Sequence, residues 1–234
     1  EKIRGDNVDP DVGALGREQH RDQQGYPEAE IIAHSEARSA MQGEIQVALD
    51  QAKADVPELR EVDLHLPTIT TSGEMVLRLG GLTLRLIPLP GQSYDALGVY
   101  IEEERILIAG DAVLPVPYFV GCDPDLLISS LQRIRPLTLP TIVQGHGDAI
   151  LKGEIGEAID RRIRYLRQVK ELVAEGIAAG RSLEEVTRSD VEAFGGSRLD
   201  LNGLTQQLHE DNLAYLYDLL KEGGAQQPTV AQRH

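Results

Sequence analysis

The hydrophobic pattern of this chain changes its period near Gly153, and this change limits the folds that the chain can adopt. Before that point, apolar and polar residues alternate in short runs, which is the pattern of half-buried β-strands. After it, apolar residues recur every three or four positions, which is the pattern of amphipathic helices. The chain therefore predicts a mixed α/β layered fold, with sheets covered by helices on the outside.

Two β-hairpins and several single strands are predicted before Gly153. The runs MVLRLG and GLTLRLIPLP meet at Gly80–Gly81, and LGVYI and RILIAGD flank a turn of three glutamates. Single strands are expected at 26–34, 62–66 and 141–146, and helices are expected at 35–55 and 123–137.

Three further helices are predicted after Gly153. Ile155 through Val173 form one long amphipathic pattern, Ser182 with Glu185 is a capping box for a second helix, and Leu213 lies on the apolar stripe of a third. The segment 224–234 is expected to be a flexible tail.

Composition narrows the classes of partner. The 234 residues carry 38 acidic and 23 basic side chains, a net charge of −15, which argues against nucleic acid as a partner. No apolar run approaches membrane-spanning length and no signal peptide is visible, so we expect no membrane partner; a soluble, cytoplasmic location is favoured, although localisation stays open. The single Cys122 excludes an internal disulfide, and we interpret it as structural.

Acidic and imidazole side chains follow the ends of several predicted elements. Asp111 comes after the apolar run RILIAG, His146 comes after TIVQG, and His20 and Asp22 lie together in EQHRDQQG. Carboxylate and imidazole groups brought together by rigid strand ends are typical metal ligands. Each residue also has an ordinary interpretation: Asp111 as a turn residue, and the His20 and Asp22 pair as part of a solvated loop.

The order of these motifs resembles the metallo-β-lactamase superfamily over roughly residues 20–221. The resemblance lies in PLPGQSYDALGVYIEEERILIAGD, then a helix, then PTIVQGHGD, and it implies an α/β fold of the αββα sandwich type with a helical C-terminal extension. It also implies that Asp111 corresponds to a bridging carboxylate, that His146 corresponds to the final histidine, and that EQHRDQ corresponds to a His–x–His–x–Asp–His loop in which His20 and Asp22 match.

The sequence departs from the family pattern at three ligand positions. Gln92 stands where the family has the histidine of Gly–His–Thr, and Glu18 and Gln23 replace two histidines of the earlier loop. A neutral amide is a poor zinc ligand, so two intact zinc sites are not expected. By the family roles, one metal position would keep His20 and Asp111, and the other would keep Asp22, Asp111 and His146. The resemblance implies at most one ion among these four candidate ligands; zinc is favoured, with iron, manganese or no metal as alternatives.

The same resemblance divides the chain into four parts. These are an irregular N-terminal segment (1–25), a metallo-β-lactamase-like core (26–152), a helical C-terminal extension (153–223) and the tail (224–234). The family's N-terminal strands have no counterpart in residues 1–25, so we expect either that residues are missing or that a partner chain or a second copy completes the sheet.

Two functions follow as hypotheses. The first is a metal-dependent hydrolase of a small-molecule ester, thioester, lactone or phosphoester, in which Asp22 and Asp111 act in catalysis. The second is a catalytically inactive relative that serves as a binding or assembly module, which the replaced histidines favour. A nucleic-acid-processing enzyme is disfavoured by the net charge.

Several other residues have open interpretations. Tyr118 and Phe119 form either an aromatic wall of the substrate pocket or part of the core. Tyr94 and Asp95, which follow Gln92, either face the cleft of the predicted site or lie in a solvent-exposed turn. His65 is expected on a solvated face of its strand, and His209 is expected to be a surface or terminal residue.

Overall fold

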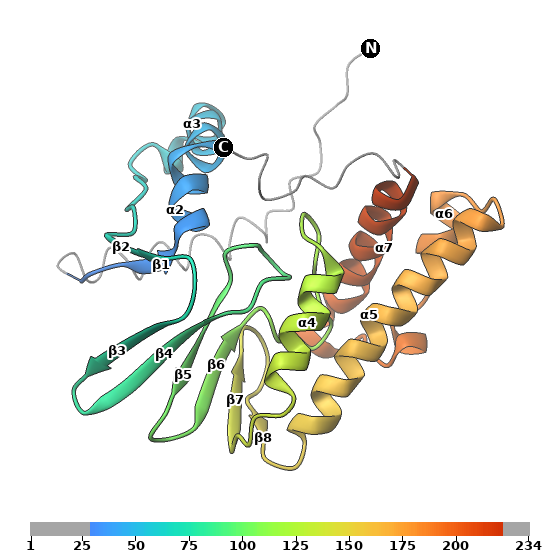
Figure 1. The fold of residues 1–234 in the computed structure, drawn as a ribbon. Coiled ribbons are helices and arrows are strands. Elements are labelled where there is room, and N and C mark those ends of the chain that lie inside the picture. The colour runs from blue at the N-terminus through green and yellow to red at the C-terminus, as the bar shows by residue number, and fades with distance from the viewer. Residues whose placement is uncertain (1–28, 222–234) are drawn as a thin grey trace. The chain divides into compact units, whose positions relative to one another are not determined.

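The computed structural model describes residues 29–221, which divide into two units at Thr71/Ser72. The first unit contains a parallel pair of short strands, β1 (Ile32–His34) and β2 (Ile69–Thr71), with two helices and a 3-10 turn between them (Figure 1). These are α2 (Ser35–Gln42), α3 (Glu44–Asp55) and η1 (Pro57–Leu59).

Two predictions for this unit need correction. The single helix predicted over 35–55 is broken at Gly43, whose φ of −110° and ψ of −103° are not helical. The strand predicted over 62–66 is wrong, because that segment forms no ladder and the strand lies at 69–71 instead. Exposure nevertheless alternates along residues 62–66, with Asp63 and His65 exposed, because an extended backbone directs successive side chains to opposite sides even without a strand partner. The described part of the strand predicted over 26–34 begins only at Ile32.

The second unit is built on a six-stranded mixed sheet with the order β3-β4-β5-β6-β7-β8. Both predicted hairpins are confirmed, with Leu79 paired to Leu82 and Ile101 paired to Ile106. All neighbouring strands are antiparallel except β6 and β7, which are parallel. The short strand β8 was not predicted, because two residues carry no periodic signal. The strand bounds are β3 (Met75–Leu79), β4 (Leu82–Pro88), β5 (Leu97–Ile101), β6 (Ile106–Gly110), β7 (Thr141–Gln144) and β8 (Ile150–Leu151).

The helices of this unit follow the predicted order and pack with the sheet. The capping box at Ser182 and Glu185 is present, as predicted. In Figure 1, α4 and α5 run along one side of the sheet, and α7 lies beside α5. None of the described helices has both the length and the apolar character needed to cross a membrane. The helix bounds are α4 (Pro124–Ile134), α5 (Ile155–Ala178), α6 (Leu183–Thr187), η2 (Val191–Phe194), η3 (Asp200–Gly203) and α7 (Thr205–Lys221).

The core lies between one face of the sheet and the helices. Leu107 of β6 and Ile142 of β7 are buried together with Leu131 of α4 and Leu166 of α5. Strand alternation directs the neighbouring residues to the opposite face. There Ile108 remains 41% exposed, so in the described structure the two faces of the sheet differ strongly in burial.

A buried polar network joins α7 to the rest of the second unit. His209 is fully buried, which corrects its prediction as a surface residue; its Nδ1 lies 3.0 Å from the Tyr165 hydroxyl and its Nε2 lies 3.1 Å from Ser189 Oγ. The Asn212 amide donates to Tyr165 and to the Pro117 carbonyl and accepts from the Phe119 amide. The polar network therefore holds the 117–119 loop against α7.

Protonation of His209 is disfavoured in the folded protein. Burial lowers the pKa of this imidazole from 6.5 to about 4, and only the Asp190 carboxylate opposes this shift. The hydrogen bonds agree with a neutral ring: Tyr165 accepts from Asn212, so its own O–H is available to donate to Nδ1, which leaves Nε2–H to donate to Ser189. A second ring proton would lie on Nδ1 and face the O–H that Tyr165 donates, so it would remove this hydrogen bond.

We expect this network to make stability pH-dependent. Between pH 6.5 and about 4 the unfolded chain binds a proton at His209 that the folded chain does not, so the free energy of unfolding falls as pH decreases, by an amount on the order of 3 kcal/mol from this group. Urea unfolding of the wild type and of His209→Gln at several pH values will measure it. The stability gap between them should narrow from pH 7 to pH 4.5; a constant gap would contradict the prediction.

Candidate functional site

Asp111 and His146 lie at the same edge of the sheet. Asp111 directly follows β6, and His146 follows β7 with one residue, Gly145, between them. Because β6 and β7 are parallel neighbours, with Gly110 opposite Gln144, their carboxyl ends meet at one edge. The backbone turns sharply there, since Gly110 has a φ of +54° that most side chains disfavour. The fold thus brings together two residues that are 35 positions apart in the chain.

These two side chains approach each other closely enough to share an ion. His146 Nε2 lies 3.7 Å from Asp111 Oδ1. Ligands of a tetrahedral zinc ion, each about 2.1 Å from the metal, lie roughly 3.4 Å apart. The Asp111 side chain is 34% exposed and the His146 side chain is 41% exposed, so the pair is accessible to water. A carboxylate and an imidazole at this spacing fit part of a metal site.

Gly145 provides the space that the Asp111 carboxylate occupies. A Cβ at position 145 would lie 1.8 Å from Asp111 Oδ1 and 2.9 Å from its Cγ, which is far inside contact distance. The Gly145 amide also donates to the Gly110 carbonyl at 2.9 Å, which ties the two loops together. Glycine at this position therefore allows the carboxylate to approach the 145–146 backbone.

The other predicted ligands are not part of this geometry. His20 and Asp22, with Glu18 and Gln23, lie outside the described residues. Within residues 29–221, no group of three or more histidine, cysteine, aspartate or glutamate side chains is arranged to hold a metal. The described part of the chain therefore supplies two candidate ligands, and the predicted set of four remains a prediction.

Gln92 lies in the turn between β4 and β5. It is half-buried, and the preceding Gly91 packs directly on α4, where a Cβ would lie 2.3 Å from Leu127 Cα. Tyr94 and Asp95 in the same turn are half-buried, which fits both predicted alternatives, a position facing the cleft and a solvent-exposed turn.

Burial decides the predictions for Phe119 and Cys122. Phe119 is completely buried in the core, with its ring edge against Tyr215, so it is not a pocket wall. Tyr118 is half-buried. Cys122 is 1% exposed, and burial raises the pKa of its thiol, which agrees with a structural role rather than a nucleophilic one.

A buried arginine connects the two loops that carry Asp111 and His146. Arg162 of α5 is 2% exposed, and its Nε and two terminal nitrogens donate to the carbonyl of Leu114, the carbonyl of Ala158 and the side-chain oxygen of Gln144. Burial lowers the pKa of the guanidinium to about 10, so it remains charged at neutral pH. Gln144 in turn donates to the Asp148 carbonyl at 2.6 Å.

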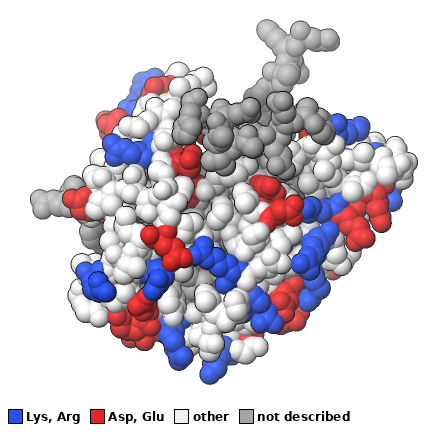
Figure 2. Space-filling model, viewed as in Figure 1, with Lys and Arg blue, Asp and Glu red and all other residues white. Residues whose placement is uncertain are grey.

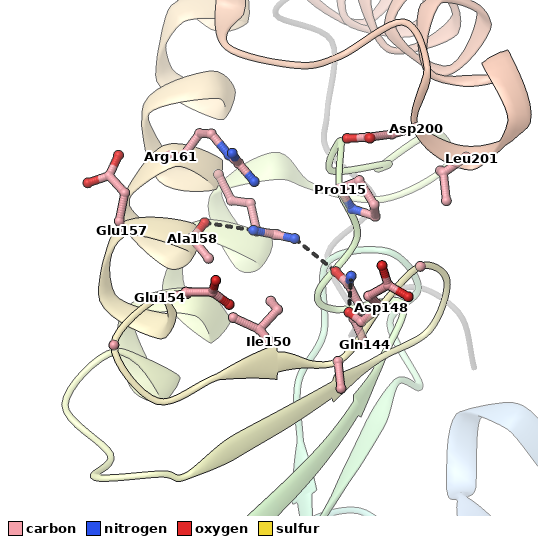
Figure 3. Close-up of a pocket in the computed structure, with 14 residues that line it drawn as sticks. Pro115, Gln144, Asp148, Ile150, Glu154, Glu157, Ala158, Arg161, Asp200 and Leu201 are labelled. Atoms are coloured by element: carbon pink, nitrogen blue, oxygen red, sulfur yellow. Dashed lines mark hydrogen bonds between the residues drawn. The ribbon is translucent and has the colours of Figure 1, made fainter.

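A pocket of about 670 Å³ lies beside this arginine (Figure 3). Its lining includes residues on either side of His146, namely Gln144 and Gly147, but not His146 itself. Arg161 and Asp200 border it from α5 and η3. The dashed lines that end at Ala158 and Gln144 in Figure 3 include the hydrogen bonds that these residues accept from Arg162, at 2.8 Å and 2.9 Å. The pocket is therefore adjacent to the Asp111 and His146 pair rather than centred on it.

Charges of both signs are mixed on the surface shown in Figure 2. Basic side chains there lie beside acidic ones. Ion pairs among the described residues include Arg135 with Asp160 at 2.9 Å and Lys170 with Asp125. Exposed pairs of this kind contribute little to stability.

Sequence reasoning missed Arg162, Gln144 and Gly145. One signal for Arg162 was available: it falls on the apolar stripe of its helix, between Ile159 and Leu166, where a charged residue needs partners. Gln144 and Gly145 carried no signal of this kind, because their roles depend on neighbours that are distant in the chain.

Comparison with known proteins identifies relatives named as β-lactamase-like proteins and relatives named as thioesterases. The chain is 34% identical over 113 residues to the β-lactamase-like protein 2 homolog of Caenorhabditis elegans, which is 47% of this chain and 36% of that protein. It is 33% identical over 96 residues to the thioesterase pkgB of Emericella nidulans, which is 40% of this chain and 28% of that protein. The matches thus span about a third of the length of these relatives. No family model matches the sequence.

Solved structures with a similar fold agree with these relatives. A metallo-β-lactamase family protein from Thermus thermophilus superposes with a TM-score of 0.56 at 20% identity, over 83% of this chain and 67% of that one. An archaeal metallo-β-lactamase superfamily protein from Sulfolobus tokodaii superposes with a TM-score of 0.53 at 15% identity, over 85% and 74%. The resemblance predicted from the sequence is thereby confirmed: this chain has the α/β fold of the metallo-β-lactamase superfamily, and its sequence relatives include proteins named as β-lactamase-like.

Proposed function

We propose that this protein is a metal-dependent hydrolase that cleaves an ester, thioester, lactone or related bond in a small molecule. The observation that carries the proposal is the 3.7 Å approach of Asp111 and His146 at neighbouring strand ends. A bound zinc ion supplies Lewis acidity and activates water for attack on a carbonyl carbon. Iron or manganese are alternative metals for the same oxygen and nitrogen ligands.

The roles of the residues follow from their chemistry. Asp111 and His146 would hold the ion, and His20 and Asp22 would complete the ligand set, with Asp22 also orienting the attacking water. The partial exposure of Asp111 and His146 makes both side chains accessible to water. Gly145 would leave free the space that the Asp111 carboxylate occupies.

A thioester is the favoured substrate within this class. The relatives include proteins named thioesterase pkgB, from Emericella nidulans, and atrochrysone carboxyl ACP thioesterase, from Claviceps purpurea. Both matches cover less than half of those proteins, so they favour the bond type rather than a particular acyl group.

Metal loading combined with hydrolysis assays will test the proposal. Purified protein is loaded with zinc, iron or manganese, freed of excess metal and analysed for its metal content. It is then assayed against a simple thioester, an aryl ester and a lactone. We expect about one ion per chain and hydrolysis that a chelator abolishes, with the thioester cleaved fastest. Only trace metal after loading, or hydrolysis unaffected by the chelator, would contradict the proposal.

A second candidate function is a non-catalytic binding module with the same fold. Two observations favour it: Gln92 occupies a position where the family has a metal-binding histidine, and the described residues contain no complete ligand cluster. In that case the loaded protein would neither retain metal nor hydrolyse any of the three substrates. The same assays therefore separate the two functions.

A further inference from the structure

Arg162 is a buried charge whose hydrogen bonds lead to both loops of the candidate site. Its Nε donates to the Leu114 carbonyl at 2.6 Å, and a terminal nitrogen donates to Gln144 Oε1 at 2.9 Å. No carboxylate of the described residues lies within ion-pair distance of it. Burying an arginine without an anionic partner is costly unless its donors are satisfied, so these hydrogen bonds offset much of that cost.

Two of the three acceptors of Arg162 lie on the segments that carry Asp111 and His146. Leu114 is three residues after Asp111, on the loop that leaves β6. Gln144 is the last residue of β7 and lies two residues before His146. The guanidinium therefore connects the segment that follows Asp111 with the end of the strand that precedes His146.

Gln144 extends this connection across the His146 turn. Its side-chain oxygen accepts from Arg162, and its side-chain nitrogen donates to the Asp148 carbonyl at 2.6 Å. The hydrogen bond from the Gln144 side chain to the Asp148 carbonyl therefore closes a loop around residues 145–147. The Gly145 amide also donates to the Gly110 carbonyl at 2.9 Å.

We infer that Arg162 and Gln144 form a brace that positions the Asp111 and His146 loops relative to each other and so sets the spacing of these two side chains. Both are positioning residues, since neither of them is a proposed ligand. The inference rests on the proposed function as far as metal affinity is concerned, whereas the order of the two loops can be measured in the metal-free protein.

The geometry of the guanidinium explains why arginine suits this position. Its planar fork directs three nitrogens to three separate acceptors, two of which lie on different loops. A lysine has a single nitrogen on a flexible stem, so it would satisfy fewer of these acceptors at once. Arg162→Lys should therefore retain the charge and lose most of the positioning.

The experiment compares Gln144→Ala, Arg162→Met, Arg162→Lys and the double variant Gln144→Ala/Arg162→Met with wild type. Arg167→Met is the control, because Arg167 is an exposed arginine on the same helix. Zinc affinity is measured by competition with a chelator. Amide hydrogen exchange of the metal-free protein is measured in peptides covering 111–115 and 145–148, with peptides of α4 as the reference for global stability.

We expect zinc to bind about 10–100-fold more weakly to Gln144→Ala and Arg162→Met, the range found for outer-shell partners of metal ligands. The double variant should lose no more than the stronger single variant, because both substitutions remove the same connection. Exchange should accelerate in the two loop peptides and not in α4, and Arg162→Lys should not restore either property. The control should match wild type.

Unchanged loop exchange in folded Gln144→Ala would overturn the inference, as would loop and α4 peptides that accelerate equally. Gln144→Ala alone decides the matter if Arg162→Met does not fold. Wild type that binds zinc while both single variants bind it equally well would refute the brace and leave the proposed function standing. Wild type that binds no metal while the loops still loosen in the variants would refute the proposed function and support the brace.

Discussion

Asp111→Asn will lower zinc affinity and hydrolysis by more than about 100-fold, which exceeds the 10–100-fold typical of outer-shell partners. The substitution keeps the size of the side chain and replaces a charged oxygen by an amide, which is a poor zinc ligand. Asp111 Oδ1 is also the atom that approaches His146 at 3.7 Å, so the change acts on the pair that carries the proposed function. Chelator competition and steady-state hydrolysis of the thioester measure the two losses.

A matched control separates this effect from a general loss of charge. Asp218→Asn on α7 makes the same chemical change at an exposed position, and it should leave zinc affinity and turnover unchanged. Thermal unfolding of both variants checks that they fold. If Asp111→Asn behaves like Asp218→Asn in every assay, the hydrolase proposal fails and the binding-module alternative is supported.

Gly145→Ala will disturb the site without changing any proposed ligand. The added methyl carbon would lie 1.8 Å from Asp111 Oδ1 and 2.9 Å from the Asp111 backbone nitrogen, so the carboxylate or the loop must move. We expect zinc affinity to fall by at least about 10-fold, as for other changes that disturb the support of a metal ligand, and stability to fall by about 1–3 kcal/mol, the usual cost of overpacking. Chelator competition and urea unfolding measure the two effects.

Gly73→Ala is the control for this substitution. A Cβ at position 73 would meet nothing within 4 Å, so the variant adds the same methyl group without a collision. It should match wild type in zinc affinity. A Gly145→Ala variant with unchanged zinc affinity would show that the Asp111 carboxylate can adopt another position at no cost. The close approach of this carboxylate to residue 145 would then not be needed for metal binding.

Local patterns in the sequence were sufficient for most elements of the second unit. The hairpin at Gly80–Gly81, the capping box at Ser182 and the stripe of α5 were predicted correctly, because turns, caps and amphipathic faces depend on residues close together in the chain. In the first unit, the strand predicted over 62–66 failed, because alternation reports exposure of an extended backbone and not the presence of a strand partner.

In the candidate site, too, some features were visible in the sequence and others depended on the tertiary structure. That Asp111 and His146 follow strand ends was visible in the sequence, and so was the family resemblance that linked them. Their 3.7 Å spacing was not, because it depends on β6 and β7 being parallel neighbours with a particular register.

The sequence by itself determined most of the order of strands and helices in the second unit, the change to helical periodicity near Gly153 and the two strand-end side chains. Only the tertiary structure decided that Arg162 is a buried connector, that His209 is fully buried and that position 145 has no room for a side chain. Periodicity and capping act over a few residues, whereas burial, hydrogen-bond partners and steric room depend on segments that meet only when the chain folds.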